Sequence, residues 1–150
     1  IDRELPDLAR QGVRTRFMGR RDRLPTELVA KMERLESETE ALDTLDLWIA
    51  FDYGGRAELV AAAQSLVRDG LAPAEIDEAA VAARLAACDL PDVDLVIRTS
   101  GERRLSNFLL WGAAYAEFVF TDLHWPDFDA AALEAAIDEF AARDRRYGAR

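Results

Sequence analysis

Short apolar runs alternate along the chain with longer segments in which apolar residues recur every three or four positions. The short runs predict strands at 13–18, 45–51, 93–97 and 118–120. The run at 45–51 is nearly continuous, which predicts a strand buried on both faces. Because strands alternate with helical segments of ten or more residues, we expect an α/β fold in which a parallel β-sheet carries helices on both faces.

Each predicted helix has a recognisable beginning or end. Thr26 is placed to cap the first helix, Gly70 ends the second, a third starts after Asp77 and runs to about Cys88, and Asp129 caps the last. The expected inward faces are apolar residues at helical spacing: Leu28, Met32, Leu35, Thr39 and Leu42; Leu59, Val60, Ala63, Leu66 and Val67; and Leu133, Ala136, Ile137 and Phe140.

Composition narrows the class of protein. The chain has 150 residues, 50% hydrophobic and 32% charged, so we expect residues 1–150 to form a single domain. One cysteine, Cys88, excludes an intramolecular disulfide and any multi-cysteine zinc site. The formal net charge of −10 argues against a nucleic-acid partner, which needs a basic face. No stretch approaches the ~20 apolar residues of a membrane-spanning helix.

The beginning of the sequence suggests that it is part of a longer protein. The chain starts at Ile1 rather than at methionine, and residues 1–12 have neither the basic start nor the apolar run of a signal peptide. Four predicted strands are also few for a parallel sheet. We therefore expect an N-terminal portion with further strands to be missing from this sequence.

The loop after the third predicted strand concentrates groups that bind anions. Residues 98–107 contain three arginines, two serines and a threonine. Ligands of open parallel sheets bind beyond the carboxyl ends of the strands, and the arginine side chain offers a planar fork for phosphate oxygens. Arg98 and Arg104 are therefore the expected charge donors, with Ser106 as a hydroxyl donor. The alternative is a solvated loop in which the arginines pair with nearby acids such as Glu102.

Three other positions are candidates for the same chemistry. Glu117 lies among strand residues, where a carboxylate is costly to bury unless it meets an arginine or a metal ion. Mg²⁺ needs only one or two protein carboxylates, so Glu117 is a candidate ligand; the alternative is an exposed position on an edge strand. Arg56 and Glu58 follow a glycine turn that opens a helix, where free backbone amides attract anions. The alternative there is a turn with no ligand.

A basic stretch surrounds the end of the first predicted strand. It is made of five arginines, which are Arg14, Arg16, Arg20, Arg21 and Arg23. We expect an exposed face that balances the acidic helix at 33–40, and contact with a phosphate or an anionic lipid is the alternative.

Several motifs resemble those of the cis-prenyltransferases, the undecaprenyl diphosphate synthase family. They are residues 98–111, the Tyr-Ala-Glu-Phe motif at 115–118 and the Trp-Pro-Asp-Phe motif at 125–128, together with Tyr-Gly-Gly-Arg at 53–56 and Arg-Arg-Tyr-Gly at 145–148. The resemblance covers essentially the whole chain and implies the C-terminal portion of the family's α/β domain. The family's N-terminal third, with its Asp-Gly-Asn-Gly-Arg-Trp-type catalytic loop and the helices around the product tunnel, does not appear in this sequence.

The resemblance implies a Mg²⁺-dependent transferase that condenses isopentenyl diphosphate with an allylic diphosphate, such as farnesyl diphosphate. The product would be a (Z)-polyprenyl diphosphate, such as undecaprenyl or decaprenyl diphosphate. The implied protein is a cytoplasmic homodimer, peripheral to the membrane surface where its product is released. Two alternatives remain: a short-chain or branching member of the family, and a non-catalytic partner subunit of a heteromeric prenyltransferase.

Roles for single residues also follow from the resemblance. The positions that match diphosphate or isopentenyl contacts are Arg98, Arg104, Leu105, Ser106, Arg146 and Gly148. Of these, Arg146 and Gly148 match an Arg-x-Gly motif that reaches a diphosphate across the dimer interface. Glu117 matches the magnesium ligand. The family's catalytic Asp has no counterpart in this chain.

Overall fold

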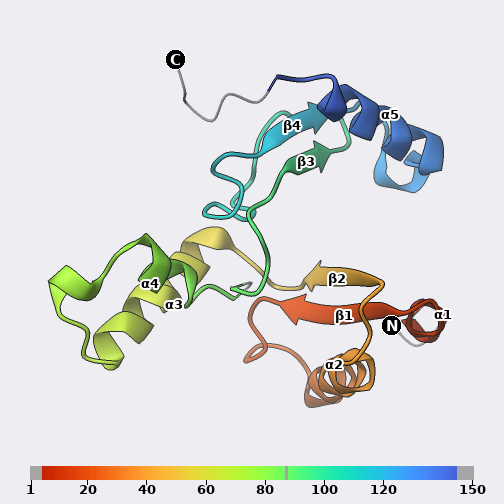
Figure 1. The fold of residues 1–150 in the computed structure, drawn as a ribbon. Coiled ribbons are helices and arrows are strands. Elements are labelled where there is room, and N and C mark those ends of the chain that lie inside the picture. The colour runs from red at the N-terminus through yellow and green to blue at the C-terminus, as the bar shows by residue number, and fades with distance from the viewer. Residues whose placement is uncertain (1–4, 87, 145–150) are drawn as a thin grey trace. The chain divides into compact units, whose positions relative to one another are not determined.

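Two compact units, residues 1–87 and 88–150, make up the chain in a computed structural model (Figure 1). The structure describes residues 5–86 and 88–144. Each unit is described by itself.

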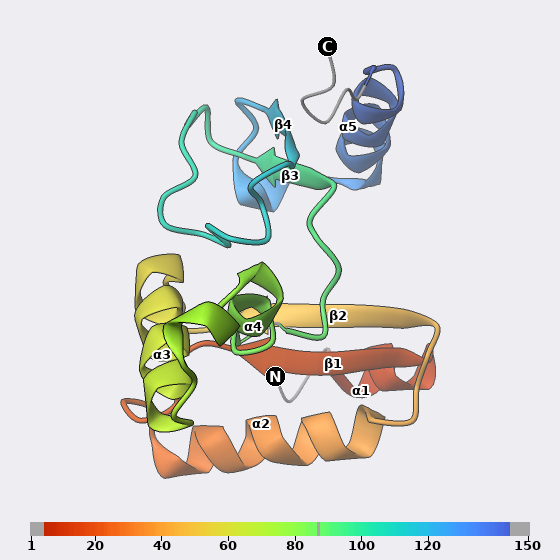
Figure 2. The ribbon, with the colours of Figure 1, turned by 60° about the vertical axis from the view of Figure 1, so that its left-hand side comes forward.

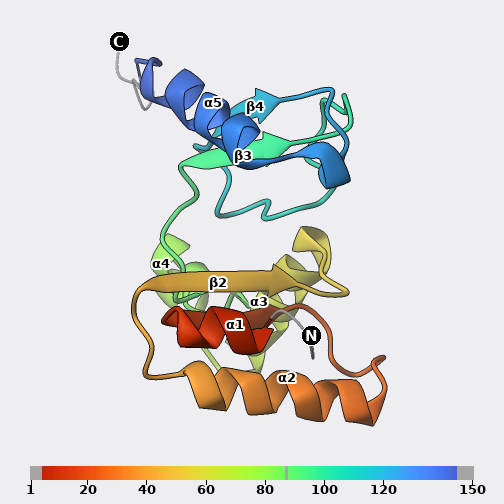
Figure 3. The same cartoon turned by 90° about the vertical axis from the view of Figure 1, so that its right-hand side faces the viewer.

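A βαβ unit forms the centre of the first unit. Its elements are α1 (Leu5–Arg10), β1 (Val13–Met18), α2 (Thr26–Thr39), β2 (Leu45–Ala50), α3 (Gly55–Arg68), a 3₁₀ turn (Pro73–Glu75) and α4 (Glu78–Ala82). The two strands pair in parallel, with Val13 opposite Leu45 and Met18 opposite Ala50. The helix α2 connects β1 to β2, and Figures 2 and 3 show it running along one side of this two-stranded sheet. The core lies between α2 and β1, where Phe17, Met32 and Leu35 are buried together.

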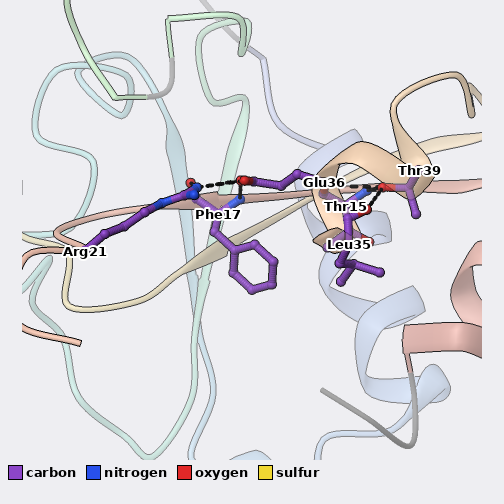
Figure 4. Close-up of polar contacts among 6 residues, drawn as sticks. All are labelled: Thr15, Phe17, Arg21, Leu35, Glu36 and Thr39. Carbon is purple, nitrogen blue, oxygen red and sulfur yellow. Dashed lines mark hydrogen bonds and ion pairs between the residues drawn. The ribbon is translucent and has the colours of Figure 1, made fainter. Parts of the chain in front are cut away.

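Side chains of α2 close one edge of β1 (Figure 4). The Thr39 hydroxyl accepts the backbone N–H of Thr15 at 3.0 Å and donates to the Leu35 carbonyl at 2.8 Å. The N–H of Phe17, two residues further along β1, donates to Glu36 at 2.9 Å, and Glu36 also accepts a hydrogen bond from Arg21 at 2.7 Å. Successive groups on one edge of a strand are two residues apart, so α2 supplies the partners that another strand would otherwise give.

The second unit contains the other pair of strands. Its elements are β3 (Leu95–Arg98), β4 (Glu117–Phe120), a 3₁₀ turn (Trp125–Asp127) and α5 (Ala130–Ala141), which contacts β4. The strands are parallel, with Leu95 opposite Glu117 and Arg98 opposite Phe120. Parallel strands and intervening helices confirm the predicted α/β class.

Most of the predicted helix boundaries are confirmed. Asp77 and Asp129 cap their helices by accepting N–H groups three residues on, and Gly70 follows α3 with a left-handed φ of 74°. The capping role of Thr26 was wrong, because Pro25 is the non-helical residue at this boundary and Thr26 already begins α2. The third helix is shorter than predicted: from Arg84 on, the amides bond to carbonyls three residues back, which tightens the chain into turns.

Burial of the second strand was predicted wrongly. Leu45 is 58% exposed and Phe51 41% exposed, because within this unit α2 packs on β1 rather than on β2. On α3, Ala62 and Leu66 are buried as the core-facing residues. The other predicted inward positions that are instead exposed are Val60, Ala63 and Val67 on α3 and Leu133 and Ile137 on α5.

We predict that Thr39→Val destabilises the first unit. Valine has the shape of threonine but cannot accept the buried N–H of Thr15, and an unsatisfied buried donor costs roughly 1–3 kcal/mol. Chemical denaturation measures the free energy of unfolding. The matched control is Thr26→Val, at the exposed beginning of the same helix, which should change stability by less than about 0.5 kcal/mol. Equal effects of the two substitutions would contradict the edge-closing role of Thr39.

Candidate functional site

Backbone hydrogen bonds hold the loop that leaves β3 against the segment that leaves β4. The Arg98 carbonyl accepts the N–H of Thr121 at 2.9 Å, and Thr121 in turn accepts the N–H of Gly101 at 2.9 Å. Ser100 donates to the Leu123 carbonyl at 2.8 Å. The parallel pairing of β3 and β4 therefore continues past the strands themselves and fixes the start of the predicted anion-binding loop.

Left-handed backbone conformations give this loop its tight shape. Positive φ values occur at Ser100, Gly101, Ser106, Asn107 and Leu109. Residues with side chains adopt this left-handed region at an energetic cost. Their number within ten positions therefore indicates that surrounding contacts hold the loop in place. At Gly101 a Cβ would lie 3.0 Å from an oxygen of the Asp122 carboxylate, so glycine also allows a close approach there.

Glu102 brings two of the predicted arginines together. Its carboxylate forms ion pairs with Arg98 and with Arg104. The hydrogen bond from Arg98, followed by the charge of Arg104, lowers the pKa of Glu102 below its ordinary value. The arginines thus do pair with a nearby acid, as the alternative interpretation expected. The loop is not neutralised, because residues 98–107 contain three arginines and one glutamate, a net charge of two positive.

The other predicted contacts of this loop lie further along it. Ser106 is exposed, in a left-handed turn with φ 52°. Leu105 is half-buried, and its carbonyl accepts the N–H of Phe108 at 3.2 Å. Both residues are therefore on the same turn-rich segment as the paired arginines.

Glu117, the predicted metal ligand, is the first residue of β4. One of its oxygens accepts a hydrogen bond from Arg143 at 2.7 Å. The expectation that a carboxylate here must meet an arginine or a metal ion is therefore met by an arginine. The strand register places Glu117 opposite Leu95, three residues before Arg98. At about 3.3 Å per residue, Glu117 lies roughly 10 Å along the strands from the point where the arginine loop begins.

Arg56 and Glu58 line a cleft of about 580 Å³ in the first unit, at the carboxyl ends of β1 and β2. The Glu58 carboxylate accepts hydrogen bonds from the Tyr53 hydroxyl at 2.5 Å and from the N–H of Ala86 at 2.9 Å. These contacts tie the beginning of α3 to the segment after α4, so Glu58 has a structural task in this position. Arg56 is exposed on the first turn of α3.

Four of the five arginines around the end of β1 are matched by acids. Ion pairs join Arg14 to Asp46, Arg20 to Asp22, Arg21 to Glu36 and Arg23 to Asp52, and the Arg16 guanidinium lies 5.6 Å from the centre of the Trp48 ring. Only Glu36 belongs to the acidic helix that was expected to balance these arginines. Of the remaining partners, Asp46 lies on β2, whereas Asp22 and Asp52 lie in the turns after β1 and β2, so contacts in the turns at the strand ends contribute half of the ion pairs.

Some predicted features fall outside what the structure describes. Arg146 and Gly148 lie outside the described residues. Within residues 5–86 and 88–144, no group of three or more His, Cys, Asp or Glu side chains gathers in a way that could hold a metal ion. In the same part of the chain, no helix has both the length and the apolar character needed to cross a bilayer.

Sequence reasoning missed Arg143 and the segment at 121–123. Arg143 contacts Glu117 across 26 positions of sequence, and its only local signal is the acid four residues earlier, Glu139. The contacts of 121–123 with the loop are made by backbone groups, which leave no trace in residue type.

Taken together, these features define an α/β protein with an arginine-rich loop at the carboxyl end of a parallel strand. The family model of undecaprenyl diphosphate synthase, a prenyltransferase model, matches residues 1–148. The chain belongs to this prenyltransferase family, as its motifs indicated.

Named relatives agree with this assignment. Isoprenyl transferase 2 of Bradyrhizobium diazoefficiens is 51% identical and the ditrans,polycis-undecaprenyl-diphosphate synthase of Xanthomonas axonopodis pv. citri 47% identical, each over 99% of this chain. The chain spans 60% and 59% of their lengths, respectively.

Solved structures show the same fold. Lavandulyl diphosphate synthase from Lavandula x intermedia, in complex with dimethylallyl diphosphate, has a TM-score of 0.92 and 32% identity; the match covers 98% of this chain and 66% of that one. A probable undecaprenyl diphosphate synthase from Campylobacter jejuni has a TM-score of 0.87 and 34% identity, covering 98% and 68%.

The lowered pKa of Glu102 predicts a pH dependence of the loop. A depressed pKa means that the folded state favours the ionised carboxylate, so its stabilising effect is present above the ordinary carboxyl pKa and is lost as pH falls through the lowered value. Carbon-13 NMR of the side-chain carboxyl should show the low midpoint, and Arg98→Gln should raise it. Arg68→Gln, on α3 in the other unit, should leave it in place. A midpoint that Arg98→Gln does not move would contradict the pairing.

Proposed function

We propose that this chain supplies the isopentenyl diphosphate half of a cis-prenyltransferase. The complete enzyme would join isopentenyl diphosphate to an allylic diphosphate and give a (Z)-polyprenyl diphosphate. The observation that carries the proposal is the loop at 98–107, which holds two arginines around one glutamate at the carboxyl end of β3 and keeps an excess of positive charge.

The proposed work of the loop is to bind and orient a diphosphate. Each guanidinium has five N–H donors, so pairing with Glu102 leaves donors of Arg98 and Arg104 for phosphate oxygens. Glu102 holds the two cations close together, which would otherwise repel each other, and so prepares the site before the ligand arrives. The exposed hydroxyl of Ser106 is a further donor, and Leu105 is the apolar neighbour that would meet the isopentenyl group.

The donor chemistry around Glu117 fits Mg²⁺ only as an ion shared with a diphosphate. Mg²⁺ takes one or two protein carboxylates and completes its shell with water and phosphate oxygens, and Glu117 offers one carboxylate with one oxygen already bound by Arg143. When bound, the ion would neutralise charge on the diphosphates. Glu117 would hold it near the loop, and the family catalytic Asp, which this chain lacks, would belong to another part of the protein.

Substrate and assembly are part of the same proposal. The Xanthomonas relative is named as specific for (2E,6E)-farnesyl diphosphate, and we propose farnesyl diphosphate as the allylic partner. Arg146 and Gly148 are proposed to reach a diphosphate across the interface of a homodimer. We further propose a cytoplasmic enzyme that releases its product at the membrane surface.

Identity favours a polyprenyl product over a short or branched one. The relatives named isoprenyl transferase or undecaprenyl-diphosphate synthase are 46–51% identical to this chain, whereas lavandulyl diphosphate synthase is 32% identical. The fold is common to both kinds of enzyme, so it does not separate them. Thin-layer chromatography of the products of the full-length protein separates the two kinds of enzyme by product length. A short or branched product would contradict the polyprenyl proposal.

A non-catalytic partner subunit is the alternative from another class. Against it stand the paired arginines and Glu117, which a subunit without substrate would not need. Mixing the chain with a catalytic prenyltransferase subunit tests this alternative directly. We expect no rise in prenyl transfer on mixing, and a rise that depends on this chain would support the partner role instead.

We predict that Arg98→Gln in the full-length enzyme raises the KM for isopentenyl diphosphate about tenfold or more. The expected loss is one charge-assisted contact, roughly 1.5–3 kcal/mol. The KM for the allylic diphosphate should change much less, because the loop serves the other substrate. Arg84→Gln is the control, since Arg84 pairs with Asp69 in the first unit. Unchanged kinetics with isopentenyl diphosphate would refute the assignment.

A further inference from the structure

Arg143 makes two contacts that join the end of α5 to the beginning of β4 and a third within its own helix. Its guanidinium donates to Glu117 at 2.7 Å, to the Phe118 carbonyl at 2.9 Å and to Glu139 at 2.5 Å. Arg143 follows the last turn of α5, and its own N–H still bonds to the Phe140 carbonyl. The side chains of Arg143 and Glu117 are 30% and 32% exposed, so water screens this pair less than it screens a fully exposed one.

We propose that Arg143 is a positioning residue that holds the place of the divalent cation at Glu117 until the cation binds. This inference rests on the proposed role of Glu117 as the metal ligand. A guanidinium already bound to the carboxylate opposes an incoming cation in two ways: it occupies one oxygen and it adds a like charge close to the ion. Metal binding to Glu117 therefore requires that Arg143 be displaced or share the carboxylate.

Glu139 lowers the cost of that displacement. Arg143 binds Glu117 and Glu139 at the same time, so a guanidinium that leaves Glu117 keeps an acidic partner on its own helix. A cation that arrives with a diphosphate also brings an anion, which is a second partner for the released guanidinium. A positive group therefore lies against the Glu117 carboxylate in both states: the Arg143 guanidinium before the ion binds, and the ion afterwards.

Metal affinity of single variants tests this exchange. The probe is Mn²⁺, titrated into the full-length protein with inorganic diphosphate present, and free Mn²⁺ is followed by electron paramagnetic resonance. We expect Arg143→Gln to tighten Mn²⁺ binding about fivefold, the scale of a partly exposed ion pair. Arg143→Lys keeps the charge and should stay within about twofold of the parent. Arg84→Gln, which breaks an ion pair in the other unit, is the matched control.

A second variant has the opposite expected sign. Glu139→Gln removes the alternative acid and leaves Arg143 more firmly on Glu117, so Mn²⁺ should bind about twofold more weakly. This variant keeps the exchange testable even where Arg143→Gln does not fold, because the Glu139 side chain is 55% exposed and that of Arg143 30%. Thermal unfolding of each variant separates loss of fold from change of affinity.

Glu117→Gln distinguishes failure of this inference from failure of the proposed metal role. If Glu117→Gln leaves Mn²⁺ affinity unchanged, Glu117 is not a ligand, and both proposals fall. If Glu117→Gln weakens binding while Arg143→Gln leaves it unchanged or weaker, the metal role stands and the exchange is overturned. Tighter binding in Arg143→Gln, together with weaker binding in Glu117→Gln and Glu139→Gln, supports the exchange.

Discussion

The need to satisfy the backbone groups of short parallel strands, and of the segments that leave them, governs both units of this chain. A two-stranded sheet leaves an outer edge on each strand, and buried N–H and carbonyl groups there must find partners. In the first unit Thr39 and Glu36 provide them for β1. In the second, the pairing between β3 and β4 continues past the strands, where backbone groups of 121–123 bond to the loop at 98–107 and shape it. The same requirement thus stabilises the fold in one place and prepares the candidate site in the other.

Two clusters in the second unit share one charged group between two partners. Glu102 pairs with two arginines, which leaves a net positive charge, whereas Arg143 pairs with two acids, which leaves a net negative charge. Excess positive charge suits a diphosphate, and excess negative charge suits a cation. The two ends of the β3–β4 pair therefore differ in the sign of their local charge, in keeping with the proposed metal-bound diphosphate.

Sequence periodicity was sufficient to predict the strands and the caps at Asp77 and Asp129, because these depend on residues close in the chain. It failed for Leu45 and Val67, since exposure depends on which neighbour packs over each face. The arginine loop could be predicted from composition and strand-end position. Arg143 could not, because its contact with Glu117 joins the end of a helix to a strand 26 positions earlier.

The closed edge of β1 has a consequence for how this protein can associate. A strand whose outer N–H groups are already bound by side chains offers no template for another strand, so edge-to-edge pairing with a foreign chain is blocked there. Among the described residues β2 pairs only with β1. Within this unit α2 therefore protects the outer edge of β1 from pairing with a further strand.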